Sequence, residues 1–229
     1  MDLPPAPRRA GRTGAHRAGH GAGHGAGQRT GQRTGWQFFA HWVGVGCLMV
    51  AAGFGGYVVW LLWGTGITTQ RAQTQLRQDW PHQVNSRPAS SAPTLVALGT
   101  RYAELQIPSI SVDMMVVQGT AYPDLKLGPG HYPETANPWD PTGRVGIAGH
   151  RTTYLHPFFN LNNVHQGDTI TLRTEYGTYV YRVNRPPFVV PQAGSGIVLT
   201  QTTHPTLVLT TCNPKYESYE RLIVTATRV

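Results

Sequence analysis

The chain of 229 residues has few cysteines and few charged residues. Its only cysteines are Cys47 and Cys212, and Asp, Glu, Lys and Arg together make up 13% of it. Two cysteines that lie 165 positions apart exclude a disulfide framework and any metal site built from several cysteines. The sequence therefore predicts a protein held together without covalent cross-links, in which each thiol needs its own explanation.

Acidic residues are also scarce, and the positive charge is uneven. Residues 1–35 hold six Arg and one Asp, residues 36–93 hold three Arg and one Asp, and residues 94–229 hold ten Lys or Arg against nine Asp or Glu. The formal net charge of +8 thus belongs mainly to the front of the chain. A nucleic-acid-binding core is not indicated, because such a core would itself carry a basic surface.

The longest uncharged stretch lies between Arg33 and Arg71, where no Asp, Glu, Lys or Arg occurs. Within it, residues 42–64 are almost wholly apolar and would extend about 34 Å as a helix, enough for a hydrocarbon core of about 30 Å. Tryptophans near both ends suit the two membrane interfaces. The stretch is too long for a signal peptide and ends in WLLWG rather than in a small-residue cleavage site. We expect an uncleaved anchor.

The flanking charges predict the orientation of this anchor. Six Arg precede it and only Arg71 and Arg77 follow soon after, so the positive-inside rule places the N-terminus in the cytoplasm and the larger part outside the cell. The composition divides the chain into four parts: a disordered basic cytoplasmic tail (1–35), a single transmembrane anchor (36–64), an extracytoplasmic linker (65–93) and a folded domain (94–229).

The outer domain is rich in short β-type runs separated by Gly, Pro, Asn and Asp. A three-residue loop, 175–177, joins two of these runs as a hairpin, with Gly177 where a positive φ is wanted. Many short strands and no long amphipathic helix after Pro81 argue for an all-β sandwich or barrel, with helical turns at 158–164. The expected strands span residues 102–107, 112–118, 144–150, 168–174, 178–184, 206–212 and 221–229.

Cys212 is the candidate for chemistry, because it ends an apolar strand and opens into a polar loop. An unpaired thiol outside the membrane is open to oxidation unless it has a use, although a buried structural cysteine remains the alternative. A reactive thiol needs a base and a donor for an oxyanion. His150 ranks first among several histidines as the base. Arg221, nine residues after Cys212, is the candidate donor, unless it is only a charge at the rim of the domain.

This constellation resembles the sortases, cysteine transpeptidases that attach secreted proteins to bacterial cell walls. Three motifs carry the resemblance: VLTTC (208–212), with Val208 where the family has Thr, IAGHRTTY (147–154) and RLIV (221–224). The segments GPGHYPET (128–135) and TTCNPKY (210–216) are most similar to class E sortases of actinobacteria.

The resemblance implies an eight-stranded sortase-type β-barrel after one transmembrane helix. It implies Cys212 as nucleophile, His150 as general acid and base, and Arg221 as the group that stabilises the oxyanion. Tyr132, Tyr154 and Thr211 are expected to bind substrate, with Tyr132 accepting a backbone N–H from Ala in a sorting signal of the Leu-Ala-x-Thr-Gly (LAXTG) type. Cleavage between Thr and Gly would be followed by transfer to a peptidoglycan-precursor amine such as lipid II.

The expected partners are secreted proteins with a C-terminal sorting signal, the amine acceptor and the membrane. No cofactor, metal ion or nucleic acid is expected, since no dense acidic loop for calcium is present. Three alternatives stay open: an L,D-transpeptidase-like cysteine enzyme of the cell wall, a non-catalytic membrane-anchored β-domain that binds a partner, and a degenerate sortase that only hydrolyses or is inactive.

Overall fold

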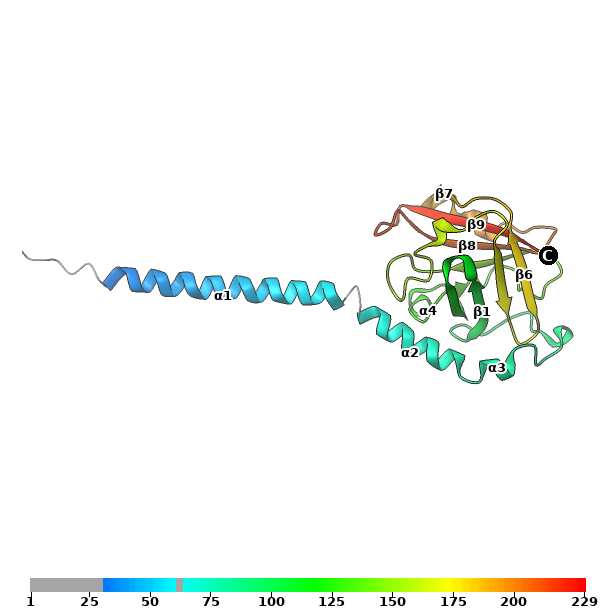
Figure 1. Cartoon of the computed structure of the whole chain (residues 1–229), viewed down its shortest axis with the longest axis horizontal. Helices are drawn as coiled ribbons and strands as arrows, with labels where there is room; N and C mark the ends of the chain where they lie inside the picture. The colour runs from blue at the N-terminus through cyan, green and yellow to red at the C-terminus, as the bar shows by residue number, and fades with distance from the viewer. Residues whose placement is uncertain (1–30, 61–63) are drawn as a thin grey trace, which may run out of the picture. The chain divides into compact units, whose positions relative to one another are not determined.

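The computed structural model describes residues 31–60 and 64–229 (Figure 1). Its first element is the helix α1 (Gly31–Val59), of which Gly35–Val59 is long and apolar enough to cross a membrane. Large apolar side chains of α1 are exposed, among them Leu48 at 71% and Phe54 at 69%. Apolar side chains exposed around a helix are typical of a segment surrounded by lipid. The helix also includes residues 31–35, which were expected to be disordered; the rest of the expected tail lies outside the described residues.

The segment after α1 is helical. The helix α2 (Thr65–Arg77) is followed by the short helix α3 (Trp80–Gln83), and the break between them falls at Asp79, where φ is 60°. Gln73 of α2 holds strand β2 at Met115, accepting from its N–H at 2.7 Å and donating to its carbonyl at 2.9 Å. Arg77 of α2 pairs with Glu104 at 3.0 Å. These contacts attach α2 to the barrel.

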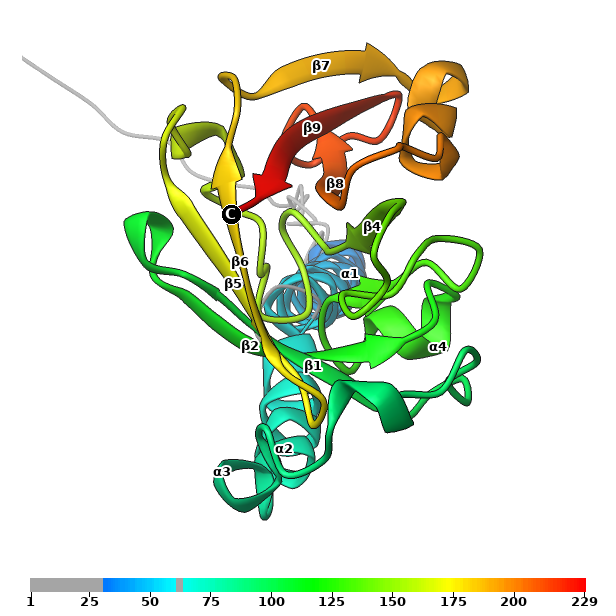
Figure 2. The same ribbon diagram turned by 90° about the vertical axis from the view of Figure 1, so that its right-hand side faces the viewer.

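Nine strands form one sheet, and eight of them close into a barrel. The order is β6-β5-β1-β2-β3-β4-β8-β9, and a further pairing of β6 with β9 closes the ring, while β7 pairs with β9 outside it (Figure 2). The pairs β2–β3 and β4–β8 are parallel, and the others are antiparallel. The eight-stranded barrel expected from the sequence is confirmed. The strands are β1 (Arg101–Ile107), β2 (Val112–Gln118), β3 (Gly130–His131), β4 (Arg144–Ala148), β5 (Thr169–Arg173), β6 (Thr178–Val183), β7 (Phe188–Pro191), β8 (Thr206–Asn213) and β9 (Glu220–Arg228).

The alternation of side chains in β9 shows how the sequence specifies the core. Leu222, Val224 and Ala226 point into the barrel interior, where they pack with apolar side chains from the other strands. Ile223 faces the opposite way and joins a second cluster with Val208, beneath β7 and the 3₁₀ helix η5 (Gln192–Leu199). Ile223 is therefore buried on the outer face of β9, where β7 and η5 cover it, whereas Arg221, Thr225 and Thr227 on the same face are partly exposed.

The β5–β6 hairpin is present, but its turn differs from the prediction. Gly177 does not have the positive φ expected of it. The side chain of Thr174 shapes the turn instead: its hydroxyl donates to the carbonyl of Gly177 at 2.9 Å and accepts from the N–H of Tyr176 at 3.0 Å. A threonine side chain that binds nearby backbone groups can stabilise a turn without a left-handed residue.

The sequence pattern did not predict β3 or β7. β3 has two residues and β7 has four, which is too short for an alternating pattern to be recognised. Both are defined by their neighbours: β3 lies between β2 and β4, and β7 lies along β9. The helical turn expected at 158–164 is present as the 3₁₀ helix η4 (Leu161–Asn163).

Candidate active site

The β8–β9 ladder places Cys212 beside Arg221. The two residues are direct partners in the antiparallel register, one near the end of β8 and the other near the start of β9. Their separation of nine residues is therefore the length of a hairpin that turns back at the loop 214–219. Cys212 is partly exposed and unpaired, as a nucleophile needs to be. Arg221 is also partly exposed.

The parallel pairing of β4 with β8 brings His150 to the same end of the barrel. The ladder ends with Ala148 opposite Thr210, and two further hydrogen bonds continue the contact. The N–H of Gly149 donates to the carbonyl of Thr210 at 3.1 Å, and the hydroxyl of Thr211 donates to the carbonyl of Gly149 at 2.7 Å. The residues that precede His150 and Cys212 are thus locked together, which fixes where both side chains leave their strands.

A cavity of about 300 Å³ lies over these strand ends and contains five of the six expected site residues. Cys212, His150 and Arg221 line it together with Tyr132 and Thr211. Another part of its wall is formed by Thr120 and Leu125, to which no sequence pattern pointed. These two come from the segment around the short helix α4 (Tyr122–Leu125), whose place beside the cavity depends on the path of the chain between β2 and β3.

The imidazole of His150 is held by packing rather than by a hydrogen bond. Its Nε2 is buried and has no hydrogen-bond partner among the described residues. Burial lowers the pKa of His150 below its ordinary value of 6.5, because a less polar surrounding disfavours the imidazolium. The ring of Tyr154 lies 4.8 Å from that of His150, centroid to centroid. His150 therefore has free nitrogen positions for proton transfer and an aromatic neighbour that limits its orientation.

The guanidinium of Arg221 is anchored at one nitrogen and free at the others. Its NH1 donates to the carbonyls of Ser218 at 2.7 Å and Glu220 at 2.9 Å. Within the described part of the chain, Nε and NH2 of Arg221 have no hydrogen-bond partner. A planar group held in this way can offer its remaining N–H bonds to an oxygen placed above Cys212.

Tyr132 lines the cavity together with Cys212 and Arg221. Burial is the main cause that raises the pKa of its phenol, and the charge of a Cys212 thiolate acts in the same direction, whereas Arg221 lowers it. Its ring packs on the second apolar cluster, and its hydroxyl makes no hydrogen bond with any described residue. The phenol is therefore available to a ligand in the cavity.

Tyr154 and Thr211 are placed differently from Tyr132. Tyr154 does not line the cavity; its hydroxyl hydrogen-bonds with that of Tyr122 at 2.9 Å, and this bond is the first cause that raises the pKa of Tyr154 to about 12. Thr211 lines the cavity, but it is only 3% exposed and its hydroxyl proton is donated to Gly149. Thr211 therefore holds the end of β4 through Gly149, and Tyr154 packs against His150.

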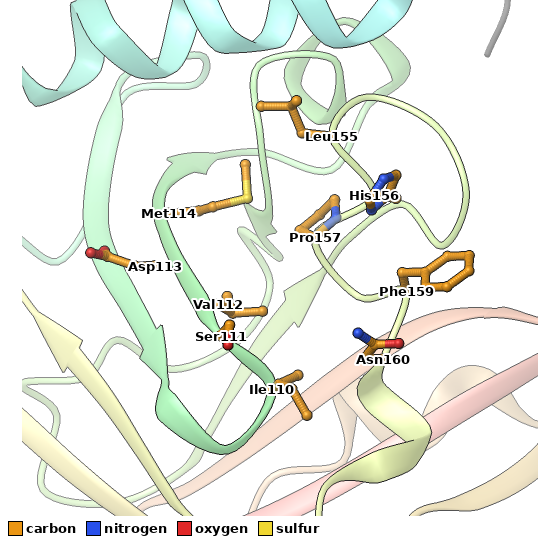
Figure 3. Close-up of a pocket in the computed structure, with 10 residues that line it drawn as sticks. All are labelled: Ile110, Ser111, Val112, Asp113, Met114, Leu155, His156, Pro157, Phe159 and Asn160. Carbon is orange, nitrogen blue, oxygen red and sulfur yellow. The ribbon is translucent and has the colours of Figure 1, made fainter. Parts of the chain in front are cut away.

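A second hollow, of about 310 Å³, contains none of the expected site residues (Figure 3). One side comes from residues 110–114 at the start of β2, and the other from residues 155–157 and 159–160. Size alone would not separate the two cavities. Only the first one brings a thiol, an imidazole and a guanidinium together.

These three groups can perform acyl transfer. A thiolate can attack a carbonyl carbon, an imidazole can carry the proton of the leaving group, and a guanidinium can stabilise the oxyanion formed in between. Partial burial lowers the pKa of His150 and so favours its neutral form, which can accept the thiol proton.

Comparison with known proteins gives one family. The family model described as "Sortase domain" matches residues 105–229, more than half of the chain. Among curated proteins, the chain is 33% identical to Sortase D of Bacillus subtilis over 110 residues, 48% of this chain and 53% of that protein. It is 30% identical to Sortase SrtE1 of Streptomyces coelicolor over 188 residues, 73% of this chain and 51% of that protein.

A solved structure shares the fold. The Sortase D5 transpeptidase of Clostridium perfringens superposes with a TM-score of 0.61 at 22% identity, covering 69% of this chain and 99% of the other. The chain spans about half the length of these two curated relatives. Activity, substrates and partners therefore need their own argument from the site.

Proposed function

The chain belongs to the sortase family, and from this premise we propose that it is a membrane-anchored cysteine transpeptidase. It would cleave a C-terminal sorting signal between Thr and Gly and transfer the acyl group to an amine of a peptidoglycan precursor. The observation that carries the proposal is the cavity in which Cys212, His150 and Arg221 meet, with Cys212 and Arg221 directly paired across two strands.

The first half of the proposed reaction forms a thioester. The thiol proton of Cys212 passes to His150, and the thiolate attacks the Thr carbonyl of the sorting signal. The free N–H groups of Arg221 donate to the oxyanion of the tetrahedral intermediate. When this intermediate collapses, the C–N bond breaks and His150 gives its proton to the departing Gly amine.

The second half reverses the proton transfer. An amine of the acceptor attacks the thioester carbonyl, and His150 takes the proton that this amine loses. Arg221 again stabilises the oxyanion, and the C–S bond breaks to release the Cys212 thiolate and the new amide. Every step uses the same three side chains, so no cofactor is required.

Two features support the proposed location at the cell membrane. Within residues 31–60 and 64–229, the helix α1 is the one apolar segment of sufficient length, and the folded domain follows it in the chain. The excess of Arg in front of α1 favours a cytoplasmic N-terminus and an extracellular catalytic domain. An enzyme facing outward would meet secreted proteins and lipid-linked acceptors at the same membrane surface.

We propose a class E preference for the LAXTG sorting signal, with Tyr132 as the residue that reads it. The free phenol of Tyr132 can accept the N–H of Ala, which a Pro in the same place lacks. Thr211, whose hydroxyl proton is already donated, can offer the peptide only its methyl group or an oxygen lone pair. Tyr154 would act on the substrate through its contact with His150.

Incubating the full chain in detergent with a sorting-signal peptide and a small amine tests the reaction, with the products identified by mass spectrometry. Cys212→Ala should abolish cleavage, because Cys212 is the thiol that lines the cavity, whereas the other cysteine, Cys47, lies in α1. His150→Ala and Arg221→Ala should each reduce turnover by at least about 10²-fold. Arg221→Lys should also be severely impaired, since an ammonium cannot reproduce the planar fork.

Cys47→Ser is the matched control, because Cys47 lies in α1 and not in the domain that carries the cavity. It should leave turnover unchanged. Full activity in Arg221→Lys would show that the guanidinium is only a surface charge. Release of peptide without any amine adduct would favour a hydrolase, and the absence of cleavage in the parent would favour a binding domain.

Competing Leu-Ala-x-Thr-Gly and Leu-Pro-x-Thr-Gly peptides test the assigned preference. The parent should favour the Ala peptide, and Tyr132→Phe should narrow this preference by about two- to tenfold, the contribution of one hydrogen bond of about 0.5–1.5 kcal/mol. A parent that favours the Pro peptide contradicts the class E assignment. If Tyr132→Phe leaves the preference for the Ala peptide over the Pro peptide unchanged, the class E assignment stands, but Tyr132 is not the residue that causes the preference.

A further inference from the structure

Arg151, the residue after His150, is a buried cation with few partners. It is 5% exposed, and its NH2 donates to Oδ1 of Asn162 at 2.9 Å. Its Nε and NH1 are buried and have no hydrogen-bond partner among the described residues. A guanidinium carries five N–H bonds, and leaving several of them unpaired in the interior costs free energy. In the sequence, Arg151 is a charged residue that directly follows the expected strand 144–150, and no pattern assigned a role to it.

The charge of Arg151 also lacks a carboxylate partner. No Asp or Glu in the described part of the chain forms an ion pair with it. Burial lowers the pKa of Arg151, and a negative charge on Cys212 acts in the opposite direction. Buried charges in proteins are normally paired, so the group that can carry the opposite charge here is the thiol of Cys212.

The backbone keeps Arg151 in place relative to Cys212. The hydrogen bonds between Gly149 and residues 210–211 lock the two strand ends together, and Arg151 and Cys212 follow within two residues of these bonds. The N–H of Phe158 returns to the carbonyl of His150 at 3.2 Å, which closes the loop that begins with Arg151. Because Phe158 is fully buried, this loop is anchored at both ends.

We propose that Arg151 is a positioning residue whose fixed, buried positive charge stabilises the thiolate of Cys212. This role rests on the proposed function and adds a second cation to it. Arg221 would act on the substrate oxygen through direct hydrogen bonds. Arg151 would act on the nucleophile through its charge, and would favour transfer of the thiol proton to His150.

Other ionisable groups also face Cys212 and have to be distinguished from Arg151. His150 comes from the end of β4, Arg221 from β9 and Tyr132 from the segment after β3. The carboxylate of Glu220 accepts a hydrogen bond from Asn213 at 2.8 Å. Arg151 is more buried than these groups, so its field is less screened by water and salt.

Alkylation of Cys212 by iodoacetamide tests the charge without any peptide substrate. The full chain with Cys47→Ser has one thiol, and its alkylation rate is measured by mass spectrometry from pH 5 to pH 10. In Arg151→Gln the midpoint of this profile should move up by about one pH unit, so that the rate near neutral pH falls about tenfold. Arg151→Lys keeps the charge and should lie closer to the parent.

A second pair of variants avoids any change to the buried side chain. Asn162→Asp places a carboxylate against NH2 of Arg151 and should also move the profile to higher pH, because it neutralises the cation. Asn163→Asp adds the same charge at the neighbouring exposed position, which does not contact Arg151, and is the matched control. Circular dichroism and thermal unfolding confirm that each variant is folded.

The results separate this inference from the proposed function. A folded Arg151→Gln with the parent profile overturns the inference, and so does an equal shift in Arg151→Lys and Arg151→Gln. Identical profiles for Asn162→Asp and Asn163→Asp also overturn it. If the parent cleaves no peptide while the profile still depends on Arg151, the proposed reaction fails and the charge effect stands.

Discussion

At the scale of single residues, His131 shows how a neighbour of the active site can serve stability. It is 1% exposed and stacks on the ring of Tyr102 at 4.1 Å between centroids. Its Nδ1 lies 2.8 Å from Oε1 of Gln118, and its Nε2 lies 3.0 Å from the carbonyl of Ala136. Burial lowers the pKa of His131 from 6.5 to about 4, so the folded protein holds this imidazole neutral.

This shift predicts a loss of stability in mild acid. The unfolded chain binds a proton at His131 below about pH 6.5, whereas the folded protein does so only near pH 4. The contribution of His131 to the free energy of unfolding should therefore be fully present above pH 6.5. It should be lost as the pH falls from 6.5 to 4, which lowers the free energy of unfolding by up to about 3 kcal/mol. Urea unfolding at a series of pH values measures it.

His131→Asn should reduce the pH dependence in this window, although the variant is less stable throughout. His204→Asn, at an exposed position, is the control and should keep the slope of the parent. Equal slopes in His131→Asn and the parent would show that the acid sensitivity comes from other groups.

At the scale of elements, the end of β4 depends on close packing at Gly149. A Cβ on Gly149 would lie 2.6 Å from Cδ2 of Phe158, a ring that is fully buried in the barrel core. The same glycine binds the backbone of Thr210 and accepts from Thr211. The small residue is thus required where strand, core and cavity meet.

Gly149→Ala should therefore affect stability and activity together. The added methyl group has to displace Phe158, which should reduce the free energy of unfolding by about 1–3 kcal/mol. It should also lower turnover, because Phe158 anchors the loop that follows His150. Urea unfolding and peptide cleavage measure the two effects.

Gly196→Ala is the control for this prediction, since a Cβ on Gly196 meets nothing within 4 Å. Its free energy of unfolding should stay within about 0.5 kcal/mol of the parent. A Gly149→Ala protein with parental stability and turnover would mean that the Phe158 ring moves without cost.

At the scale of the whole molecule, the domain that carries the cavity extends beyond the barrel. The helix α2 binds β2 through Gln73, and Glu104 on β1 accepts from Arg77, Trp80 and Arg173. The chain from α2 onward is therefore tied to the barrel on its β1–β2 side. In the chain, α1 ends at Val59 and α2 begins at Thr65.

Labelling from outside the cell tests the proposed orientation. In a background with Cys47→Ser and Cys212→Ala, Ser90→Cys should react with a membrane-impermeant maleimide on intact cells, because Ser90 is exposed and follows the anchor. Thr13→Cys should react only after the membrane is permeabilised. Labelling of Thr13→Cys on intact cells, or release of a soluble domain that begins after α1, would contradict the proposal.

The barrel strands with a clear apolar period could be predicted from the amino-acid pattern alone. Each of the seven expected strands is present with small changes at its ends. Apolar residues at alternate positions lie on the same face only when the chain is extended, so this pattern predicts strands. The pairing of Cys212 with Arg221 could also be anticipated, since a hairpin relates positions by their separation in the chain. The apolar length of α1 follows from composition alone.

Features that depend on contacts between distant segments could not be predicted from the sequence. The short strands β3 and β7 exist because their neighbours supply hydrogen bonds, and the packing of α2 rests on Gln73 reaching Met115. The position of His150 beside Cys212 follows from the parallel β4–β8 pairing, which no local pattern specifies. The burial of Arg151 is likewise a property of the closed loop. The local sequence determines which residues of a strand share a face, whereas pairing with strands far along the chain determines which strand ends lie together.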